Sequence, residues 1–232
     1  MKKSGAFAVL YEDNHLLVVN KAAGILVQGD QTGDVPLVEL CKSYIKERYD
    51  KPGAVFLGVV HRIDRPVSGI VVLARTSKAL ERMNALFREK ATRKTYWAVV
   101  RNKPAQEQGN LVHWLQKDEK KNKTTAYPRE TVGALRSELN YRAILHQHGY
   151  WLLEVNPITG RPHQIRVQLA SMNCPIKGDT KYGYPEPNHD SSICLHARRL
   201  EFVHPVKKEK LMLEAPLPQN ENWQSFSNDL VL

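Results

Sequence analysis

Short apolar runs separated by polar turns recur along the chain and indicate a mixture of strands and helices. Six runs are rich in valine, isoleucine and aromatic residues, which is typical of strands. They span residues 15–20, 55–60, 69–74, 96–100, 139–145 and 150–155. The helical patterns fall between them irregularly, so strict alternation of strand and helix is not kept. The pattern therefore predicts an α+β fold with a mixed, largely antiparallel sheet flanked by helices.

Three segments have the apolar spacing of amphipathic helices. The first covers residues 37–45, and Asp34 is its predicted cap. The second follows a cap at Thr76 or Ser77, and the third begins at Pro162, because proline is favoured in a first helical turn.

Two further segments look peripheral. The lysine-rich stretch 116–123 predicts an exposed hairpin or loop, and either a grip on RNA or a merely solvated turn fits its charge. The chain from residue 216 onward is expected to form a peripheral tail.

The charge balance points to a polyanionic partner. Lysine and arginine number 34 against 24 acidic residues, which gives a formal net charge of +10. A positive field concentrates nucleic acid and speeds its encounter with the protein. No apolar run reaches the roughly 20 residues that a membrane span needs, so a soluble protein is expected, with no membrane partner.

The cysteines and histidines give no sign of a disulfide framework or a metal site. Cys41, Cys174 and Cys194 lie far apart, and such a sparse, odd-numbered set fits a reducing cytosol. His146 and His148 come closest to the spacing of metal ligands, but no second ligand cluster follows them. We therefore expect a cytoplasmic protein without a metal.

One segment joins charged residues to turn formers and then to an apolar strand. It spans residues 61–74, and its Asp64 lies between two arginines. Pro66 and Gly69 keep the backbone out of regular structure, so Asp64 is expected on a loop that packs against a rigid strand. Flanking guanidinium groups favour the ionised carboxylate that a nucleophile or base requires. A structural ion pair in a turn is the alternative interpretation.

A second segment, residues 159–166, places Arg161, His163 and Arg166 around the start of a helix. Backbone N–H groups already favour anions there. The three side chains are suited to gripping phosphates or a carboxylate such as Asp64, although a solvated basic helix end would show the same pattern.

A third segment, residues 93–98, carries Tyr96 beside the basic pair Arg93 and Lys94. A tyrosine in this setting stacks on a nucleic-acid base while the cations hold the backbone. Ordinary packing within a strand is the alternative interpretation.

Together these segments resemble the RluA-type pseudouridine synthases, from about residue 11 to residue 216. Residues 61–74 look like the catalytic motif of that family, and residues 20–24 look like its N-terminal motif, with Ala22 where proline is usual. Residues 160–166 resemble a third motif, and Gln168 stands just beyond it where histidine is frequent. The stretches 178–183 and 195–205 agree as well.

The resemblance implies three catalytic residues. Asp64 corresponds to the essential aspartate, Tyr96 to the active-site tyrosine, and Arg166 to the arginine that pairs with the aspartate.

It also implies residues that bind the RNA. Ile165 is expected to line the uracil pocket, and Arg62 to fill the gap that the flipped nucleotide leaves. Arg161 and His163 are expected to contact the RNA at the same helix start.

The expected protein is a monomeric enzyme that isomerises uridines in ribosomal or transfer RNA. We expect a single catalytic domain over residues 1–232, with a central RNA-binding cleft and no separate N-terminal RNA-binding module. No metal, nucleotide or other cofactor is expected, because the sequence carries no phosphate-cradling glycine loop and no nicotinamide fingerprint.

Three other functions compete with this one. A kinase-like phosphotransferase is disfavoured, because Ile63 separates Arg62 from Asp64, whereas in a kinase catalytic loop the aspartate follows the arginine directly. A non-catalytic protein that uses the same basic cleft to assist RNA folding is the main alternative. A glycosidase that cleaves the same bond without rejoining it is the third.

Overall fold

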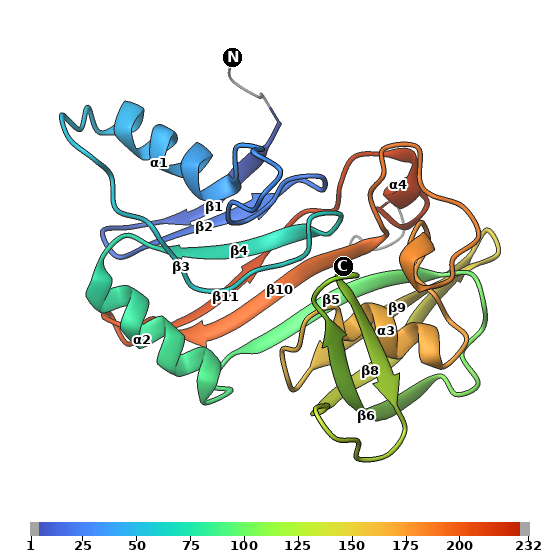
Figure 1. Ribbon diagram of the computed structural model, residues 1–232. Coiled ribbons are helices and arrows are strands. Elements are labelled where there is room, and N and C mark those ends of the chain that lie inside the picture. Colours follow the sequence, from blue (N-terminus) through green and yellow to red (C-terminus); the bar gives the residue numbers. More distant parts are fainter. Residues whose placement is uncertain (1–4, 228–232) are drawn as a thin grey trace. The chain divides into compact units, whose positions relative to one another are not determined.

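The computed structural model describes residues 5–227, which divide into two compact units. Unit 1 holds the described residues up to Arg93 together with Ala197–Pro216, and unit 2 holds Lys94–His196 together with the described chain from Leu217. Each unit combines antiparallel strands with a few helices (Figure 1). The prediction of an α+β fold with a largely antiparallel sheet is therefore confirmed, whereas the single domain stays a prediction.

Unit 1 is built on antiparallel strands, with the buried strands β2 and β4 in their middle. The strands are β1 (Phe7–Glu12), β2 (Leu16–Lys21), β3 (Gly58–Val59), β4 (Ser68–Ala74), β10 (Leu195–Val203, shared with unit 2) and β11 (Lys210–Glu214). The order is β1-β2-β4-β10, with β3 paired to β4 and β11 paired to β10. Every residue of β4 is buried, which explains its unbroken apolar sequence.

Two helices accompany these strands in unit 1. Helix α2 (Ser77–Arg88) starts as predicted, since Thr76 Oγ1 accepts a hydrogen bond from the backbone N–H of Ala79 at 3.1 Å. Helix α1 (Leu37–Arg48) starts after Pro36 without a side-chain cap. The predicted cap at Asp34 is therefore wrong, because its carboxylate forms an ion pair with Arg65 at 2.8 Å instead.

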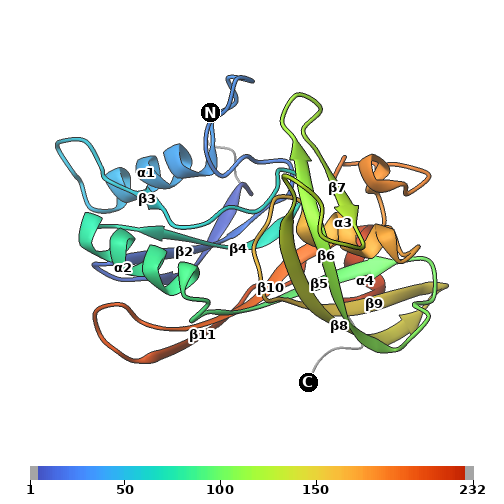
Figure 2. The ribbon, with the colours of Figure 1, turned by 60° about the horizontal axis from the view of Figure 1, so that its bottom comes forward.

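Unit 2 contains a meander of long strands. They are β5 (Arg93–Val100), β6 (Gln108–Asp118), β7 (Lys123–Tyr127), β8 (Leu135–Gln147) and β9 (Tyr150–Pro157). Their order is β5-β9-β8-β6-β7, and each neighbouring pair is antiparallel. Figure 2 shows β6, β7 and β8 side by side. The predicted hairpin at residues 116–123 is confirmed, since β6 and β7 pair up to Asp118 and Lys123.

Short helices complete unit 2. Helix α3 (Gln164–Ser171) begins two residues later than predicted, because Pro162 lies in a turn and His163 takes the left-handed conformation, with φ 55°. A 3-10 turn, η1 (Thr180–Tyr182), follows it in the chain.

The predicted peripheral tail is wrong. The chain beyond residue 216 forms helix α4 (Glu221–Ser227), and the side chains of Trp223 and Phe226 are only 1% and 2% exposed. The ring of His196 meets that of Trp223 edge-on, with 5.8 Å between the centroids. Large aromatic side chains dominate the energetics of burial, so this segment belongs to the core of unit 2.

Within residues 5–227, no helix is long and apolar enough to cross a lipid bilayer. The same part of the chain holds no group of three histidine, cysteine or carboxylate side chains able to bind a metal ion. His146 stacks on Trp151 at 4.3 Å, and His148 lies in the turn after β8 with φ 51°. All three cysteines are buried thiols, and burial raises the pKa of Cys41 to about 12.

Candidate active site

Asp64 lies in a tight turn of unit 1, directly before β4. Its carbonyl oxygen accepts a hydrogen bond from the N–H of Val67 at 3.1 Å. Ile63 and Val67 are 8% and 2% exposed, whereas Asp64 is half-buried and Arg62 is exposed. Apolar neighbours on both sides thus hold the turn in the core and leave the carboxylate at its border, as the sequence predicts.

Gly69 is required by the strand that supports this turn. Its φ is +116°, and a Cβ atom there would lie 2.4 Å from the carbonyl oxygen of Ala197 in β10. Only glycine allows the two backbones to approach so closely. The Ser-Gly pair after Asp64 therefore fixes where β4 begins.

Beneath the turn lies a buried ammonium group that the sequence analysis did not single out. Lys21, the last residue of β2, is 0% exposed. Its Nζ donates to the carbonyl oxygens of Ala22 at 2.9 Å, Ile25 at 2.8 Å and Arg65 at 3.3 Å. Burial lowers the pKa of Lys21 to about 7, and the nearby Asp64 carboxylate opposes that shift. Three backbone carbonyls thus hold the Lys21 amine in place near the candidate catalytic carboxylate.

The loop of residues 20–24 is tied to the Asp64 turn by Arg65. The N–H of Gly24 donates to the carbonyl oxygen of Arg65 at 2.8 Å, and Arg65 Nε donates back to the carbonyl oxygen of Gly24 at 3.1 Å. Ala22, which replaces the usual proline, donates its N–H to the carbonyl oxygen of Ala6 at 3.0 Å. A proline could not make that bond, so the substitution brings its own stabilising contact.

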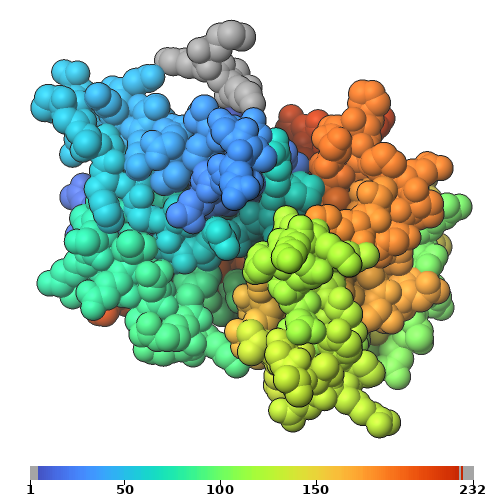
Figure 3. Space-filling view, in the orientation of Figure 1, coloured from blue at the N-terminus to red at the C-terminus, as the bar shows by residue number. Residues whose placement is uncertain are grey.

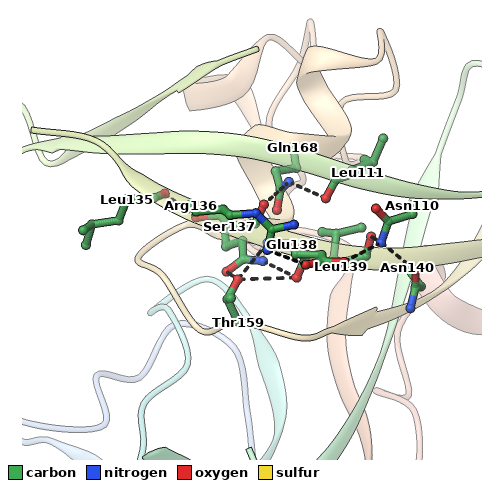
Figure 4. A network of polar contacts seen from close by, with 11 residues as sticks. Asn110, Leu111, Leu135, Arg136, Ser137, Glu138, Leu139, Asn140, Thr159 and Gln168 are labelled. Atoms are coloured by element: carbon green, nitrogen blue, oxygen red, sulfur yellow. Dashed lines mark hydrogen bonds and ion pairs between the residues drawn. The ribbon is translucent and has the colours of Figure 1, made fainter. Parts of the chain in front are cut away.

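In unit 2, two glutamine side chains of α3 bond to the strands, and Figure 4 shows one of them, Gln168. Gln164 Nε2 donates to the carbonyl oxygen of Glu138 at 3.0 Å, and its Oε1 accepts the hydroxyl of Thr159 at 2.8 Å. One turn later, Gln168 Nε2 donates to the carbonyl oxygen of Leu111 at 3.1 Å. Gln168, found where histidine is frequent, thus bonds α3 to β6.

Arg166 forms a buried, bidentate ion pair within unit 2. Its Nε lies 2.7 Å from Asp179 Oδ2, and its second nitrogen lies 2.8 Å from Asp179 Oδ1. The two side chains are 6% and 1% exposed. Two parallel charge-assisted bonds fix the plane of the guanidinium group.

Tyr182 connects this pair to the neighbouring elements. Its ring lies under the guanidinium carbon of Arg166, 5.0 Å from the ring centroid. Its hydroxyl accepts the backbone N–H of Thr124 at 2.8 Å and lies 2.7 Å from His163 Nδ1. The Tyr182 hydroxyl thus contacts both β7 and the residue before α3.

Tyr96 lies in β5 of unit 2, opposite Val155 of β9. It is half-buried, and its neighbour Thr95 accepts a hydrogen bond from Asn156 Nδ2 at 3.0 Å. The strand therefore presents Tyr96 on a firmly paired part of the sheet.

The predicted site residues fall into two groups. Arg62 and Asp64 share one turn of unit 1. The members in unit 2 are Tyr96, Arg161, His163, Ile165 and Arg166. Ile165 is buried in the first turn of α3, while Arg161 is exposed just before it.

Three residues were missed as members of the site, namely Lys21, Asp179 and Tyr182. A lysine at the end of an apolar strand was a signal for Lys21. The stretch 178–183 had been matched to the family, but nothing in its sequence assigned roles to Asp179 and Tyr182.

Known proteins similar to this chain share one activity in their names. Residues 15–171 match the RNA pseudouridylate synthase family. Ribosomal large subunit pseudouridine synthase C of Vibrio cholerae is 34% identical over 90% of this chain and 65% of that protein. Its namesake in Buchnera aphidicola is 31% identical over 96% of this chain and 70% of that protein. The chain thus spans 65% of the length of the Vibrio cholerae relative.

A solved structure agrees with these relatives. Human RNA pseudouridylate synthase domain containing 4 superposes with a TM-score of 0.76 at 25% identity, over 91% of this chain and 89% of that one. Since the family match covers both the Asp64 turn and α3, this chain belongs to the RNA pseudouridylate synthase family.

Proposed function

We propose that the protein is an RNA pseudouridine synthase with Asp64 as its catalytic carboxylate. The observation that carries the proposal is the setting of Asp64, a half-buried carboxylate in a pinned turn beside the buried ammonium of Lys21. An amine held by three backbone carbonyls next to a carboxylate at the border of the core is an arrangement suited to catalysis.

The reaction exchanges one bond of uridine for another. The N1–C1′ glycosidic bond breaks, the uracil turns, and C5 joins C1′. The proton of C5 leaves and a proton is placed on N1, so the product is an isomer of the substrate. No oxidant, reductant or energy source is consumed. The target must first leave the helical stack so that the half-buried carboxylate of Asp64 reaches it.

In this scheme Asp64 acts on the ribose or the base as a nucleophile or general base. Three routes satisfy the same balance of atoms, namely attack at C1′, addition to the base and removal of the 2′ proton. Each route uses the carboxylate of Asp64 in its ionised form.

The remaining catalytic roles fall to unit 2. Arg166 orients Asp64 and keeps it ionised, and Tyr96 stacks on the uracil and assists proton transfer from C5. The rigid Arg166–Asp179 pair supports the role of Arg166, because its two charge-assisted bonds fix the plane of the guanidinium group.

Four further residues are proposed to hold the RNA. Exposed Arg62 fills the space of the flipped nucleotide, and Ile165 lines the uracil pocket. Arg161 and His163 bind RNA before the start of α3. Wild-type RNA affinity and turnover of an Arg62→Ala variant would contradict the role of Arg62.

The proposed substrate is ribosomal RNA. The curated relatives bear the name of the large ribosomal subunit, and transfer RNA is the second substrate to test. The proposed enzyme works as a cytoplasmic monomer without a nucleotide cofactor.

The test follows the hydrogen that leaves C5. Ribosomal and transfer RNA transcribed with tritium at uracil C5 are incubated with wild type, Asp64→Asn and a control, Asp50→Asn. Asp50 is an exposed residue of unit 1 with φ 45°, a conformation that asparagine tolerates. We expect release of tritium to water by wild type and the control, and none by Asp64→Asn. Release by Asp64→Asn at the wild-type rate would reject the catalytic role.

The same incubation separates the other two functions. A protein that only assists RNA folding would bind the RNA and release no tritium. A glycosidase would leave free uracil in the product mixture. Neither outcome is expected.

A further inference from the structure

Exposed cations gather around the β6–β7 hairpin of unit 2, on a part of the chain outside the proposed catalytic residues. Five of them, the hairpin cations, are Lys120, Lys121, Lys123, Arg161 and Lys181. In the space-filling view, the yellow-green side chains of this part of unit 2 lie at the surface (Figure 3).

Two hydrogen bonds and a cation–ring contact bring these cations into one neighbourhood. Lys181 Nζ donates to the carbonyl oxygen of Asn122 in the hairpin turn at 3.0 Å. Thr124 Oγ1 donates to the carbonyl oxygen of Pro162, the residue after Arg161, at 3.1 Å. Lys123 Nζ lies 6.0 Å from the centroid of the Tyr182 ring. Three separate segments, β7, η1 and the turn before α3, thus present positive charge together.

The acidic side chains of the hairpin turn are bonded to neighbouring groups. Of the two carboxylates, Glu119 pairs with Lys117 at 2.6 Å, and Asp118 Oδ1 accepts the backbone N–H of Lys121 at 3.0 Å. The turn therefore keeps a surplus of lysine charge toward solvent, which is the pattern of a phosphate-binding surface rather than of a self-neutralised ion-pair network.

The base of the hairpin is rigid. The buried hydroxyl of Tyr182 accepts the N–H of Thr124 at 2.8 Å and also contacts His163. The hairpin cations are thereby anchored to the helix start that carries Arg166. A lysine whose backbone is fixed loses less freedom when it grips a phosphate than one on a loose loop.

We propose that the hairpin cations bind the phosphate backbone of the RNA outside the target uridine. The inference rests on the proposed function in that RNA is the partner. Lysine supplies point charges for phosphate oxygens, and Arg161 supplies a planar fork for the same groups. Contacts of this kind position an RNA without reading its sequence.

The experiment measures RNA affinity as a function of salt. The variant Lys120→Gln/Lys121→Gln/Lys123→Gln is compared with wild type by filter binding to ribosomal RNA and transfer RNA transcripts. Each lost phosphate contact removes about 0.7 to 0.9 from the slope of log K against log salt. We expect a slope shallower by about 2 and an affinity about tenfold weaker near 0.15 M salt, on the scale that counterion release sets.

A charge-matched control separates a local site from a general field. Lys46→Gln/Lys51→Gln/Lys78→Gln removes the same three charges from exposed positions in unit 1. We expect this control to lose less than half as much RNA affinity as the hairpin variant. Equal losses in the two variants, or wild-type affinity in the hairpin variant, would overturn the inference.

The result is distinguishable from failure of the proposed reaction. Binding is measured without turnover, whereas tritium release by wild type reports the isomerisation. If RNA affinity depends on the hairpin cations but wild type releases no tritium, the proposed reaction is rejected and the RNA-binding surface stands. If wild type releases tritium but the hairpin variant binds RNA normally, the surface is rejected and the reaction stands.

Discussion

Both carboxylate oxygens of Asp179 accept hydrogen bonds from the guanidinium group of Arg166, at 2.7 and 2.8 Å, in a part of unit 2 that solvent barely reaches. Asp179 belongs to the turn before η1, and Arg166 to the first turn of α3. The pair therefore joins two short elements and sets the direction of a proposed catalytic side chain.

Asp179→Asn should destabilise the protein and slow catalysis. The change leaves a buried guanidinium without its charge partner, which typically costs about 3 to 5 kcal/mol of unfolding free energy. Urea unfolding measures this loss, and tritium release should show a lower kcat. Glu39→Gln is the control, because Glu39 pairs with Lys42 on the surface of α1, where such pairs contribute about 0 to 1 kcal/mol. Equal losses in the two variants would contradict the assignment.

Tyr182→Phe should lower kcat while leaving the fold intact. The ring stays under Arg166, but the hydroxyl that contacts Thr124 and His163 is lost, so the helix start is held less firmly. We expect a fall of about three- to tenfold in tritium release, equivalent to about 1 kcal/mol. The control is Tyr141→Phe, which removes the hydroxyl of another buried tyrosine in unit 2, bonded to the carbonyl oxygen of Gln106. A similar fall in both variants would indicate a general packing effect.

Lys21 should make stability depend on pH in the alkaline range. Its pKa is lowered from 10.5 to about 7 in the folded protein, so between these values the unfolded chain binds more protons. The contribution of this group to stability is therefore present above about pH 10.5 and declines as pH falls toward 7, at most by about 1.4 kcal/mol per pH unit. Urea unfolding of wild type and Lys21→Met at pH 7 and pH 9 measures the difference. If the unfolding free energies of wild type and Lys21→Met change equally between pH 7 and pH 9, Lys21 does not cause the pH dependence.

Asp13 should confer stability that is lost in acid. Burial alone would raise the pKa of Asp13, but hydrogen bonds from the N–H groups of His15 and Leu16 and from Lys207 outweigh it and hold that pKa well below its ordinary value. The stabilisation is complete above the unfolded pKa of 3.8 and disappears as pH falls through the lower folded value.

We therefore expect Asp13→Asn to lower the unfolding free energy by about 2 kcal/mol at pH 7. The difference in unfolding free energy between wild type and Asp13→Asn should become smaller below about pH 4, the ordinary pKa of an aspartate. A gap that stays constant down to pH 3 would show that the carboxylate charge is not the stabilising feature.

Trp223→Ala should destabilise unit 2. The indole is 1% exposed and meets His196, so its removal leaves a large cavity. Truncations of this kind cost about 3 to 5 kcal/mol. Thermal unfolding measures the loss, with Gln224→Ala as a control at an exposed neighbouring position. If Trp223→Ala were as stable as wild type, the chain beyond residue 216 would be peripheral, as the sequence predicted.

Local signals predicted β2, β4 and α2 of unit 1, but they gave no prediction for β1, β10 and β11. The runs at 15–20 and 69–74 became β2 and β4, because uninterrupted β-branched residues in short segments favour buried strands. Thr76 capped α2 as its side-chain chemistry requires. In contrast, only Gly58 and Val59 of the run 55–60 entered a strand, because pairing with β4 is confined to those two residues.

The less apolar strands of unit 2 escaped prediction. Half of β6 alternates weakly between half-buried and exposed positions, so its sequence gives little signal before β7 and β8 are paired on either side. The role of Asp179 was hidden for a similar reason. An aspartate thirteen positions from Arg166 becomes its partner only through the tertiary fold.

The discontinuous make-up of unit 1 has a consequence for how the chain folds during synthesis. Strand β4 is complete at Ala74, but its neighbour β10 emerges only after all of residues 94–196. Until then the nascent chain carries an open strand edge beside Gly69, and such edges favour wrong pairing between chains. The ribosome thus delivers the first segment of unit 2 before unit 1 can close, so a slow step or a chaperone requirement should fall between these two points of translation.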